Sequence, residues 1–251
     1  MMNSMRQLVR RWLRRRGYEI YRLPKVWAPW GGRLLSVPDA DFQRVFDAAE
    51  PDPAHRSRLK SETNAKICRC WMLKSLLQTL GPLEHHVAEC GVNRGLSAYV
   101  IAEYLRRAGF SSPHEFQLYD TFEGIPDINP EFDDPASVNK GLYATPYELV
   151  VDRFRAFPFV KIVRGRIPES LGPAADRRFS FLHLDLNIYD AYRDSLQFFW
   201  PRMATPSIIV CDDYGFSGSR GASQAVDEFA AAERVKVVYM PTGQAVIWKL
   251  R

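Results

Sequence analysis

The sequence has 251 residues, a length at which one α/β domain with short appendages is more readily built than two separate cores. A hydrophobic content of 46%, with 25% charged and 13% aromatic residues, is typical of a globular protein and argues against wholesale disorder and collagen-like repeats. The net charge of +5 divides into +7 for residues 1–25 and −2 for the remainder, which argues against a basic nucleic-acid-binding domain and predicts no nucleic-acid partner.

Residues 1–23 form an arginine-rich N-terminal arm. Within it, residues 4–16 place four apolar side chains at helical spacing, which predicts a basic amphipathic helix. Such a helix is suited to peripheral contact with an anionic membrane surface. Packing against a second subunit of a homo-oligomer, or a solvated arm, explains the same pattern, so these alternatives stay open.

The cysteines and the hydropathy pattern indicate the cellular compartment. Cys68, Cys70, Cys90 and Cys211 are too few and too irregularly spaced for a disulfide framework or a zinc site. No window approaches the roughly 18 apolar residues of a membrane span, and the arginine-rich start is unlike a secretory signal. We therefore expect a cytoplasmic protein, with peripheral contact at the inner face of the cytoplasmic membrane if the arm binds lipid.

Residues 24–82 are expected to form a connector followed by two helices. The connector is rich in Pro, Gly and Trp, a composition that is unusual for regular structure. The first helix should begin after Asp39 and bury one apolar face, while the second should be capped by Ser61 and end at Gly81.

Residues 83–251 alternate short apolar runs with amphipathic segments, which predicts an α/β domain with a mostly parallel sheet and helices on both faces. Strands are expected at about residues 86–90, 115–119, 159–164, 179–185 and 206–211. Helices are expected at about residues 95–108, 146–157, 190–200 and 221–233. Two final runs, at 235–239 and 245–250, would complete a seven-stranded sheet with a C-terminal antiparallel strand.

Ligands of an open parallel sheet bind at the carboxyl ends of the strands, so the residues that follow each strand are site candidates. The first strand leads into Glu89-x-Gly91-x-x-x-Gly95, a glycine turn that lets the backbone approach a ligand at a helix start. The second strand ends at Asp120, which is placed to accept hydrogen bonds from ribose hydroxyls. The dinucleotide fingerprint G-x-G-x-x-G is absent; the turn instead resembles the first motif of class I S-adenosylmethionine (AdoMet) methyltransferases.

Three carboxylates, Asp185, Asp212 and Asp213, follow the fourth and fifth strands. Converging carboxylates repel one another unless they are protonated or bind a cation, and an all-oxygen set suits Mg²⁺ or another hard divalent cation. A helix cap or a salt bridge is the alternative for each aspartate alone. A cation held by all three could chelate neighbouring hydroxyls of a sugar or catechol and acidify one of them for methyl transfer.

Together these motifs resemble the metal-dependent sugar O-methyltransferases typified by the macrocin and mycinamicin enzymes. The resemblance covers about residues 60–250 and rests on residues 87–92, 94–95, 119–124, 165–171, 185–189, 212–215 and 241–245. It implies a Rossmann-like class I methyltransferase fold, AdoMet as methyl donor and Mg²⁺ as cofactor. The implied acceptor is a sugar hydroxyl of a glycan, glycolipid or glycosylated natural product.

The resemblance also assigns residues to roles. Metal binding falls to Asp185, Asp212 and Asp213. The predicted AdoMet contacts are Glu89, Gly91, Val92, Asn93, Arg94, Gly95, Ser97, Asp120, Thr121 and Phe122.

One position departs from the family. The usual pattern after the fourth strand is D-x-D-x-Y, and its second aspartate is a candidate general base, but this sequence has Asn187 there. A neutral amide cannot accept a proton at pH 7. The base is therefore Asp185 or Asp190, or else a metal alone lowers the pKa of the acceptor hydroxyl enough for it to react. His183, inside the apolar strand, is interpreted as a core residue.

Residues 121–145 are expected to form an irregular lid segment over the site, with its acidic residues solvated. Other functions remain open at this point. A catalytically weak or inactive AdoMet-binding module would explain Asn187, and a catechol-type O-methyltransferase would use the same AdoMet and metal residues. A peripheral membrane scaffold would use the N-terminal arm alone.

Overall fold

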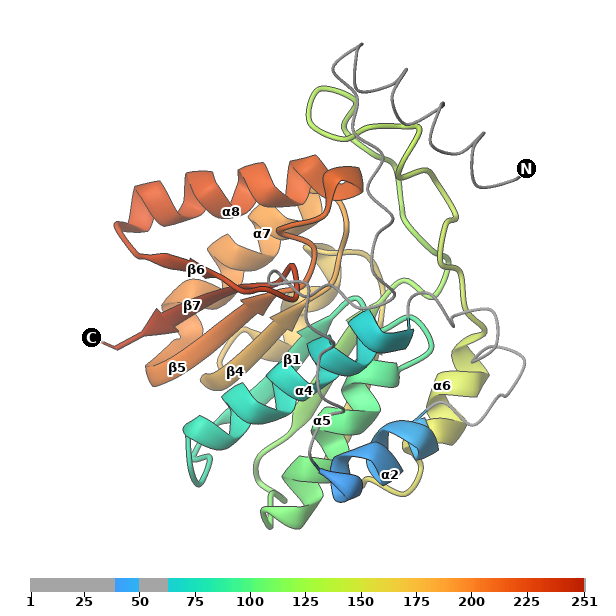
Figure 1. The fold of residues 1–251 in the computed structure, drawn as a ribbon, viewed down its shortest axis with the longest axis vertical. Helices are drawn as coiled ribbons and strands as arrows, with labels where there is room; N and C mark the ends of the chain where they lie inside the picture. Colours follow the sequence, from blue (N-terminus) through green and yellow to red (C-terminus); the bar gives the residue numbers. More distant parts are fainter. Residues whose placement is uncertain (1–38, 50–62, 251) are drawn as a thin grey trace, which may run out of the picture.

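The computed structural model describes residues 39–49 and 63–250. At its centre is a seven-stranded sheet with the order β3-β2-β1-β4-β5-β7-β6 (Figure 1). The strands are β1 (His86–Cys90), β2 (Phe116–Asp120), β3 (Val160–Arg164), β4 (Phe179–Leu184), β5 (Met203–Cys211), β6 (Val237–Tyr239) and β7 (Ala245–Lys249). Strands β1 to β5 pair in parallel, whereas β7 pairs antiparallel with β5 and β6. The predicted sheet is confirmed.

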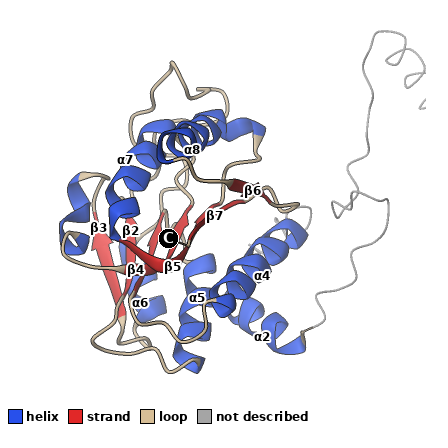
Figure 2. Ribbon diagram, turned by 90° about the vertical axis from the view of Figure 1, so that its left-hand side faces the viewer, coloured by secondary structure: helices blue, strands red, loops and turns tan. Residues whose placement is uncertain are grey.

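Helices cover both faces of this sheet, as Figure 2 shows from the side. One layer contains α2 (Ala40–Ala49), α4 (Thr63–Thr79), α5 (Leu96–Arg107) and α6 (Tyr147–Phe154). The other contains α7 (Tyr189–Phe199) and α8 (Arg220–Glu233). Short 3-10 turns stand at η1 (Glu169–Ala174), η2 (Trp200–Arg202) and η3 (Ser217–Ser219). None of the helices in the described ranges has the length and apolar character that a bilayer span requires.

Helix α2 begins where the sequence predicted. The Asp39 carboxylate accepts the backbone N–H groups of Asp41 and Phe42, both at 3.0 Å, and such a cap contributes roughly 1 kcal/mol. Its second oxygen accepts a hydrogen bond from Lys74 of α4 at 3.0 Å, so the cap also joins the two helices. The predicted basic helix over residues 4–16 and the Ser61 cap lie outside the described residues.

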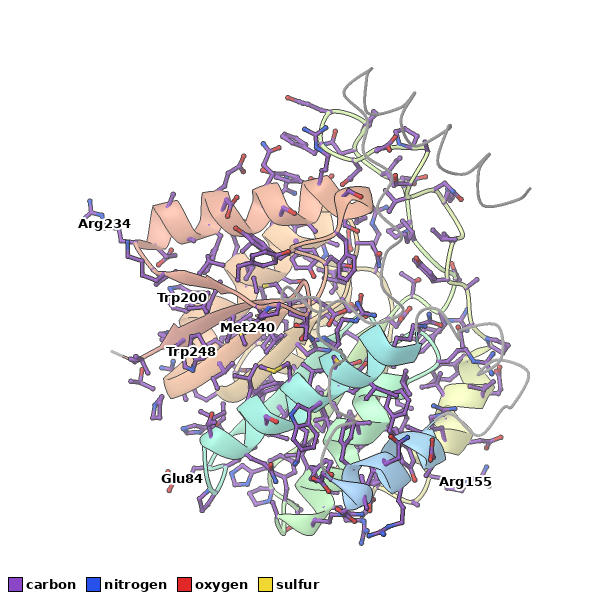
Figure 3. All side chains as sticks on the ribbon, in the orientation of Figure 1. Glu84, Arg155, Trp200, Arg234, Met240 and Trp248 are labelled. Atoms are coloured by element: carbon purple, nitrogen blue, oxygen red, sulfur yellow. The ribbon has the colours of Figure 1, made fainter. Side chains whose placement is uncertain are left out.

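The core fills the two spaces between the sheet and its helices (Figure 3). Every residue of β1 and β4 is buried, as expected for central parallel strands covered on both faces. The largest fully buried side chains include the aromatic residues Phe116, Phe179, Phe181 and Phe199. Truncating one of these to alanine would cost about 3–5 kcal/mol, so these rings contribute substantially to the stability of the sheet that carries the site.

The observed element boundaries agree with the prediction to within a few residues, and β5 shows the clearest difference. It begins at Met203 rather than near residue 206. Its pairing with β4 passes from Met203 opposite Phe179 to Ile208 opposite Phe181, so the intervening residues bulge out of the ladder. Proline is tolerated at such irregularities, which is why Pro206 does not mark the strand start as its sequence pattern suggested.

The strand order reverses between β1 and β4, which lie side by side at the centre of the sheet. Ligands of open α/β sheets bind at the carboxyl edge of such a reversal. Because β1, β2, β4 and β5 are parallel, the residues that follow all four strands meet at one edge.

Candidate active site

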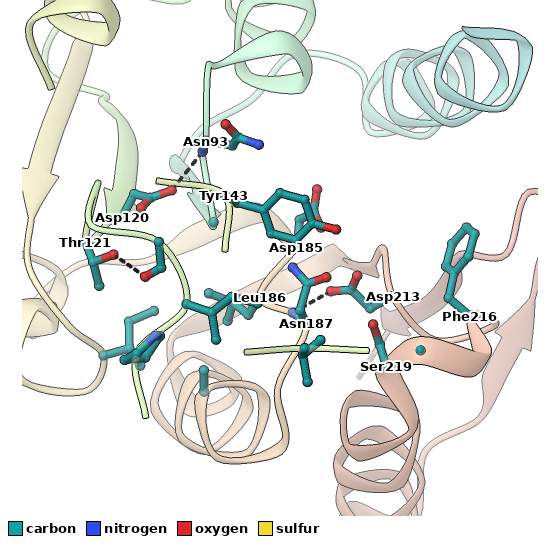
Figure 4. Close-up of a pocket in the computed structure, with 18 of the residues that line it drawn as sticks. Asn93, Asp120, Thr121, Tyr143, Asp185, Leu186, Asn187, Asp213, Phe216 and Ser219 are labelled. Carbon is teal, nitrogen blue, oxygen red and sulfur yellow. Dashed lines mark hydrogen bonds between the residues drawn. The ribbon is translucent and has the colours of Figure 1, made fainter. Parts of the chain in front are cut away.

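A cavity of about 530 Å³ opens at this carboxyl edge. Its wall comes from the turn after β1, the end of β2, the residues that follow β4 and β5, and the lid segment (Figure 4). A smaller cavity of about 100 Å³ shares Arg69, Asn93 and Asp185 with it. The larger volume is in the range of small-molecule sites, and the walls of the two cavities together contain most of the residues that the sequence predicted.

Gly91 shapes the turn after β1. Its φ of 85° lies in the left-handed region, and a Cβ atom on this residue would overlap the backbone carbonyl oxygen of Asp185. The Asp185 N–H in turn donates to the Cys90 carbonyl at 2.9 Å. The turn therefore lies directly on the residue that follows β4, and a side chain at position 91 would force the two segments apart.

Asp120 holds the other side of the same turn. Its Oδ2 atom accepts the N–H groups of Val92 at 2.7 Å and Asn93 at 2.8 Å, while Oδ1 accepts the N–H of Phe122 at 2.7 Å. The residue is half-buried and lines the larger cavity (Figure 4). A carboxylate oxygen has about two lone pairs, so Oδ1 can still accept a hydrogen bond from a ligand hydroxyl.

Glu89 lines neither cavity and lies fully buried beneath the turn. Its Oε1 accepts the Ser97 hydroxyl at 2.7 Å, and its Oε2 lies 3.4 Å from Nδ1 of His183. The other ring nitrogen of His183 lies 3.4 Å from Oδ1 of Asp212. Burial alone would lower the pKa of His183, but Glu89 and Asp212 raise it to about 10. His183 is thus a buried cation that joins the start of α5 to the acids after β5.

The other predicted AdoMet contacts fall into three groups. Gly91, Asn93 and Thr121 line the larger cavity. Val92, Asn93, Arg94 and Ser97 line the smaller one. Gly95 and Phe122 line neither: a Cβ on Gly95 would lie 2.8 Å from the Phe154 ring, and the Phe122 ring packs on Tyr147 with centroids 5.2 Å apart. These last two residues pack against α6 and do not face either cavity.

The three aspartates that we name the acid cluster, Asp185, Asp212 and Asp213, meet at the ends of β4 and β5. Asp212 is the most engaged of them. Its Oδ1 accepts the side-chain amide of Gln244 at 2.7 Å and faces His183, while its Oδ2 forms an ion pair with Arg69 of α4. Both oxygens of this carboxylate therefore already have cationic or hydrogen-bonding partners.

The other two acids lie on the cavity side (Figure 4). Oδ2 of Asp213 accepts the Asn187 N–H at 2.8 Å and the Tyr192 hydroxyl at 2.9 Å. Within the described residues, no group donates a hydrogen bond to the Asp185 carboxylate. Asp185 is consequently the acid with the most freedom to interact with a ligand.

The acids titrate differently because their surroundings differ. Burial would raise the pKa of Asp212, but Arg69 and His183 hold that pKa at about 2. Burial and the charge of Asp212 raise the pKa of Asp213 to about 6. Burial, followed by the charges of Asp212 and Asp213, raises the pKa of Asp185 well above its ordinary value. The cluster thus contains one fixed anion and two coupled carboxyl groups that take up a proton readily.

The donor chemistry of the acid cluster suits a hard divalent cation, but its arrangement does not. Among residues 39–49 and 63–250, no group of three or more His, Cys, Asp or Glu side chains is placed so that it could hold a metal ion. In addition, the oxygens of Asp212 are already engaged by Arg69, His183 and Gln244. The Mg²⁺ predicted from the sequence therefore has no preformed site in this arrangement.

Of the candidates for the missing general base, Asp185 lines the cavity and Asp190 does not. Asp190 lies in the first turn of α7 and forms an ion pair with Arg193 at 2.7 Å. Asn187 lies in the cavity wall between Asp185 and Asp213 (Figure 4), with a φ of 64°. Its contact to Asp213 is made by the backbone N–H, so the side-chain amide is left to the cavity.

The lid segment, residues 121–145, is irregular as predicted. It is nevertheless anchored: Asp133 is only 3% exposed, and its carboxylate accepts the N–H groups of Tyr189 at 3.0 Å and Asn129 at 3.2 Å. The expectation of solvated acids was therefore wrong for Asp133, which caps the start of α7. Ile125 and Val138 add a small apolar contact to the same region.

Sequence reasoning missed several residues of this site. Arg69 and Lys66 reach it from α4 and Tyr192 from α7, and no strand-end pattern includes them. Gln244 lies in the Pro-Thr-Gly-Gln-Ala stretch that carried the family resemblance, so its motif was visible although its bond to Asp212 was not.

The sheet order, the antiparallel β7, the glycine turn and the acid at the end of β2 together define a Rossmann-like methyltransferase. The profile of the family described as macrocin O-methyltransferase (TylF) matches residues 79–249. The chain belongs to this family, and it is an AdoMet-dependent O-methyltransferase. No curated protein sequence matches it.

Solved structures show the same fold. The O-methyltransferase NovP aligns with a TM-score of 0.63 at 21% identity, over 74% of this chain and 81% of NovP. The calicheamicin methyltransferase CalS11 aligns with a TM-score of 0.65 at 16% identity, over 87% of this chain and 98% of CalS11. The SAH-bound methyltransferase PaMTH1 of Podospora anserina aligns with a TM-score of 0.51 at 18% identity, over 87% of this chain and 99% of PaMTH1.

Proposed function

We propose that the protein transfers the methyl group of AdoMet to a sugar hydroxyl of a glycan, glycolipid or glycosylated natural product. The observation that carries the proposal is the cavity itself, because one wall is the turn held by Asp120 and the opposite wall is the acid cluster. The macrocin O-methyltransferase family supports a sugar acceptor. So does the description of CalS11 as a TDP-rhamnose 3'-O-methyltransferase.

The residues around the turn suit AdoMet. Gly91 lets the ligand approach the backbone, and Asp120 offers Oδ1 to a ribose hydroxyl. Arg94 lines the smaller cavity, and its buried Nε has no hydrogen-bond partner among the described residues. That cation suits the carboxylate of a methionine moiety. When bound, AdoMet supplies an electrophilic methyl group. The SAH-bound PaMTH1 structure supports this choice of ligand.

We propose that Asp185 accepts the proton of the acceptor hydroxyl. An alcohol is a poor nucleophile until its proton is removed, and a base works best when its pKa lies near the working pH. Asp185 faces the cavity, makes no competing hydrogen bond within the described residues and has a raised pKa. Asn187 would orient the acceptor through its amide, and the lid segment would keep water away from the site.

The role of Mg²⁺ remains a proposal from the family resemblance. Because the acid cluster as arranged in the described residues does not form a metal site, the proton transfer to Asp185 is proposed without a metal. Dialysis against a chelator, followed by measurement of turnover with and without added Mg²⁺, tests the requirement directly.

The function is tested with AdoMet carrying a labelled methyl group and a panel of nucleotide sugars, glycosides and catechols. Label transfer to a sugar hydroxyl is the expected outcome, whereas transfer to catechols alone would replace the sugar acceptor. AdoMet binding in calorimetry without turnover on any acceptor would favour the second candidate, a regulatory AdoMet-binding module, which Asn187 supports. Absence of AdoMet binding would refute both.

Residues 1–23, 24–82 and 83–251 are proposed as arm, connector with helices, and methyltransferase domain. For the arm we propose contact with anionic lipid through residues 4–16, because four apolar residues lie among arginines there. Removing residues 1–22 should weaken binding to vesicles that contain phosphatidylserine. Unchanged vesicle binding would leave subunit packing, which sedimentation of both forms would then detect as a change from oligomer to monomer.

A further inference from the structure

Two cations face the acid cluster: the buried His183 and Arg69, which also lines the cavities. Arg69 projects from α4, a helix far from the cluster in sequence, and forms an ion pair with Oδ2 of Asp212. Its side chain is 21% exposed, and it lines both cavities together with Asp185. Arg69 is therefore placed between the two ligand spaces, beside the three carboxylates that the family resemblance assigns to metal binding.

Two further contacts hold Arg69 in this position. Its guanidinium carbon lies 5.3 Å from the centre of the Phe216 ring, which is within the range of a cation–π interaction. The partner carboxylate is itself fixed, because Gln244 donates to Oδ1 of Asp212 at 2.7 Å and His183 faces the same atom. The ion pair is thus a preorganised contact between buried or half-buried groups, unlike a mobile surface pair.

A divalent cation bound to the acid cluster would compete with Arg69 for Oδ2 of Asp212. Oδ1 of Asp212 already has two partners, and Oδ2 of Asp213 accepts hydrogen bonds from Asn187 and Tyr192. Mg²⁺ and Mn²⁺ require several oxygen ligands in a compact shell. Oδ2 of Asp212 faces the guanidinium of Arg69, so it is not free to serve as one of these ligands.

We propose that Arg69 competes with a divalent cation for Asp212, so that metal can enter the acid cluster only when the arginine side chain withdraws. Arg69 is then a built-in counter-ion that holds the three acids together in the metal-free protein and lowers the apparent affinity for metal. This inference rests on the proposed metal-binding role of the cluster, but it depends on neither AdoMet nor the acceptor.

The test is a titration of the full-length protein with Mn²⁺, followed by electron paramagnetic resonance of the free ion, with no AdoMet or acceptor present. The variant Arg69→Gln removes the competing cation, and its Mn²⁺ dissociation constant should fall about tenfold or more, because the charge that pairs with Asp212 is gone. The matched control is Lys66→Gln. Lys66 lies one turn earlier on α4, lines the same cavities and forms no ion pair with the three acids. The Lys66→Gln variant should therefore gain clearly less affinity for Mn²⁺ than Arg69→Gln, because only a charge without direct contact to the acids is removed.

Equal affinities of Arg69→Gln and wild type would overturn the proposal, and so would an equal gain in Lys66→Gln, which would reveal a general charge effect. If Arg69→Gln does not fold, Arg69→Lys carries the test. The shorter, compact ammonium group reaches Asp212 less well, and the dissociation constant for Mn²⁺ should fall at least about threefold; no change would again overturn the proposal. A methyltransferase that fails every acceptor assay could still give either result, so the two proposals fail independently.

Discussion

The two walls of the cavity are built in different ways. The cofactor wall is the turn after β1 together with Asp120, and backbone geometry determines its structure. Gly91 has no side chain to push this turn away from Asp185, and Asp120 accepts hydrogen bonds from three backbone N–H groups. The acid wall is the acid cluster, and charged side chains determine its structure. Asp212 is held between Arg69 and His183, and the pKa values of Asp185 and Asp213 are raised.

This difference separates two kinds of sensitivity. Substitutions on the cofactor wall should alter shape, and therefore stability and AdoMet binding, at any pH. Substitutions on the acid wall should alter charge, and therefore turnover, metal binding and the dependence of each on pH. His183 and Glu89 connect the walls through buried polar contacts. Substitutions at these two residues should therefore affect both the stability of the fold and its dependence on pH.

The largest effect is expected at Gly91. Gly91→Ala adds a Cβ atom that overlaps the Asp185 carbonyl and also strains a φ of 85°, which should destabilise the fold by about 3 kcal/mol or more. Gly109→Ala is the matched control, because Gly109 has a φ of 77° with no atom within 4 Å of an added Cβ; only about 1 kcal/mol is expected there. Urea unfolding measures both. Equal losses would show that the close packing of the turn has no energetic consequence.

The next effect is expected on the acid wall. Asp185→Asn should lower kcat by about 10²–10⁴ while the AdoMet dissociation constant stays within about threefold, because a proton acceptor is lost without a change of shape. Asp190→Asn serves as the control, since Asp190 pairs with Arg193 away from the cavities. Steady-state kinetics and calorimetry separate the two parameters. Loss of turnover in Asp190→Asn alone would assign the base to α7.

A smaller effect is expected at Asp120, and it should fall on AdoMet binding instead of kcat. Asp120→Ala removes three bonds from the turn and the oxygen offered to the ribose, and AdoMet binding should weaken about 10- to 100-fold. The value of kcat at saturating AdoMet should change little. Glu123→Ala is the control on the same segment, because Glu123 is 75% exposed and pairs with Arg164. A fall in kcat without weaker binding would contradict the division between the walls.

How much of this site was predictable depended on whether a residue follows a strand. Apolar runs mark buried parallel strands, and parallel strands bring their carboxyl ends to one edge. Asp120, Asp185, Asp212 and Asp213 could therefore be assigned to one site from order alone, and the structure places them around the same two cavities.

Contacts made by helices and by the lid segment were not predictable in this way. Arg69 lies 143 residues from Asp212, and nothing in its neighbourhood distinguishes it from a solvated helix residue. Asp133 stands in a polar segment that looks exposed, yet its carboxylate caps α7. Such partners are selected by tertiary packing, which a local pattern does not encode.

The smallest effect, and the one that tests the link between the walls, concerns His183 and pH. Its folded pKa of about 10 exceeds the ordinary value of 6.5, so the charged histidine contributes stability that is fully present below pH 6.5 and is lost as pH rises through 10. His183→Gln should remove the dependence of the melting temperature on pH between 6.5 and 10. The melting temperatures of wild type and variant should therefore converge by a few degrees as the pH rises over this range. Differential scanning calorimetry across the alkaline range measures this dependence. His86 differs in sign: burial lowers its pKa, so its contribution to stability is lost as pH falls below 6.5. Parallel curves for wild type and His183→Gln would mean that His183 is uncharged in the fold, and that Glu89 and Asp212 are held by packing alone.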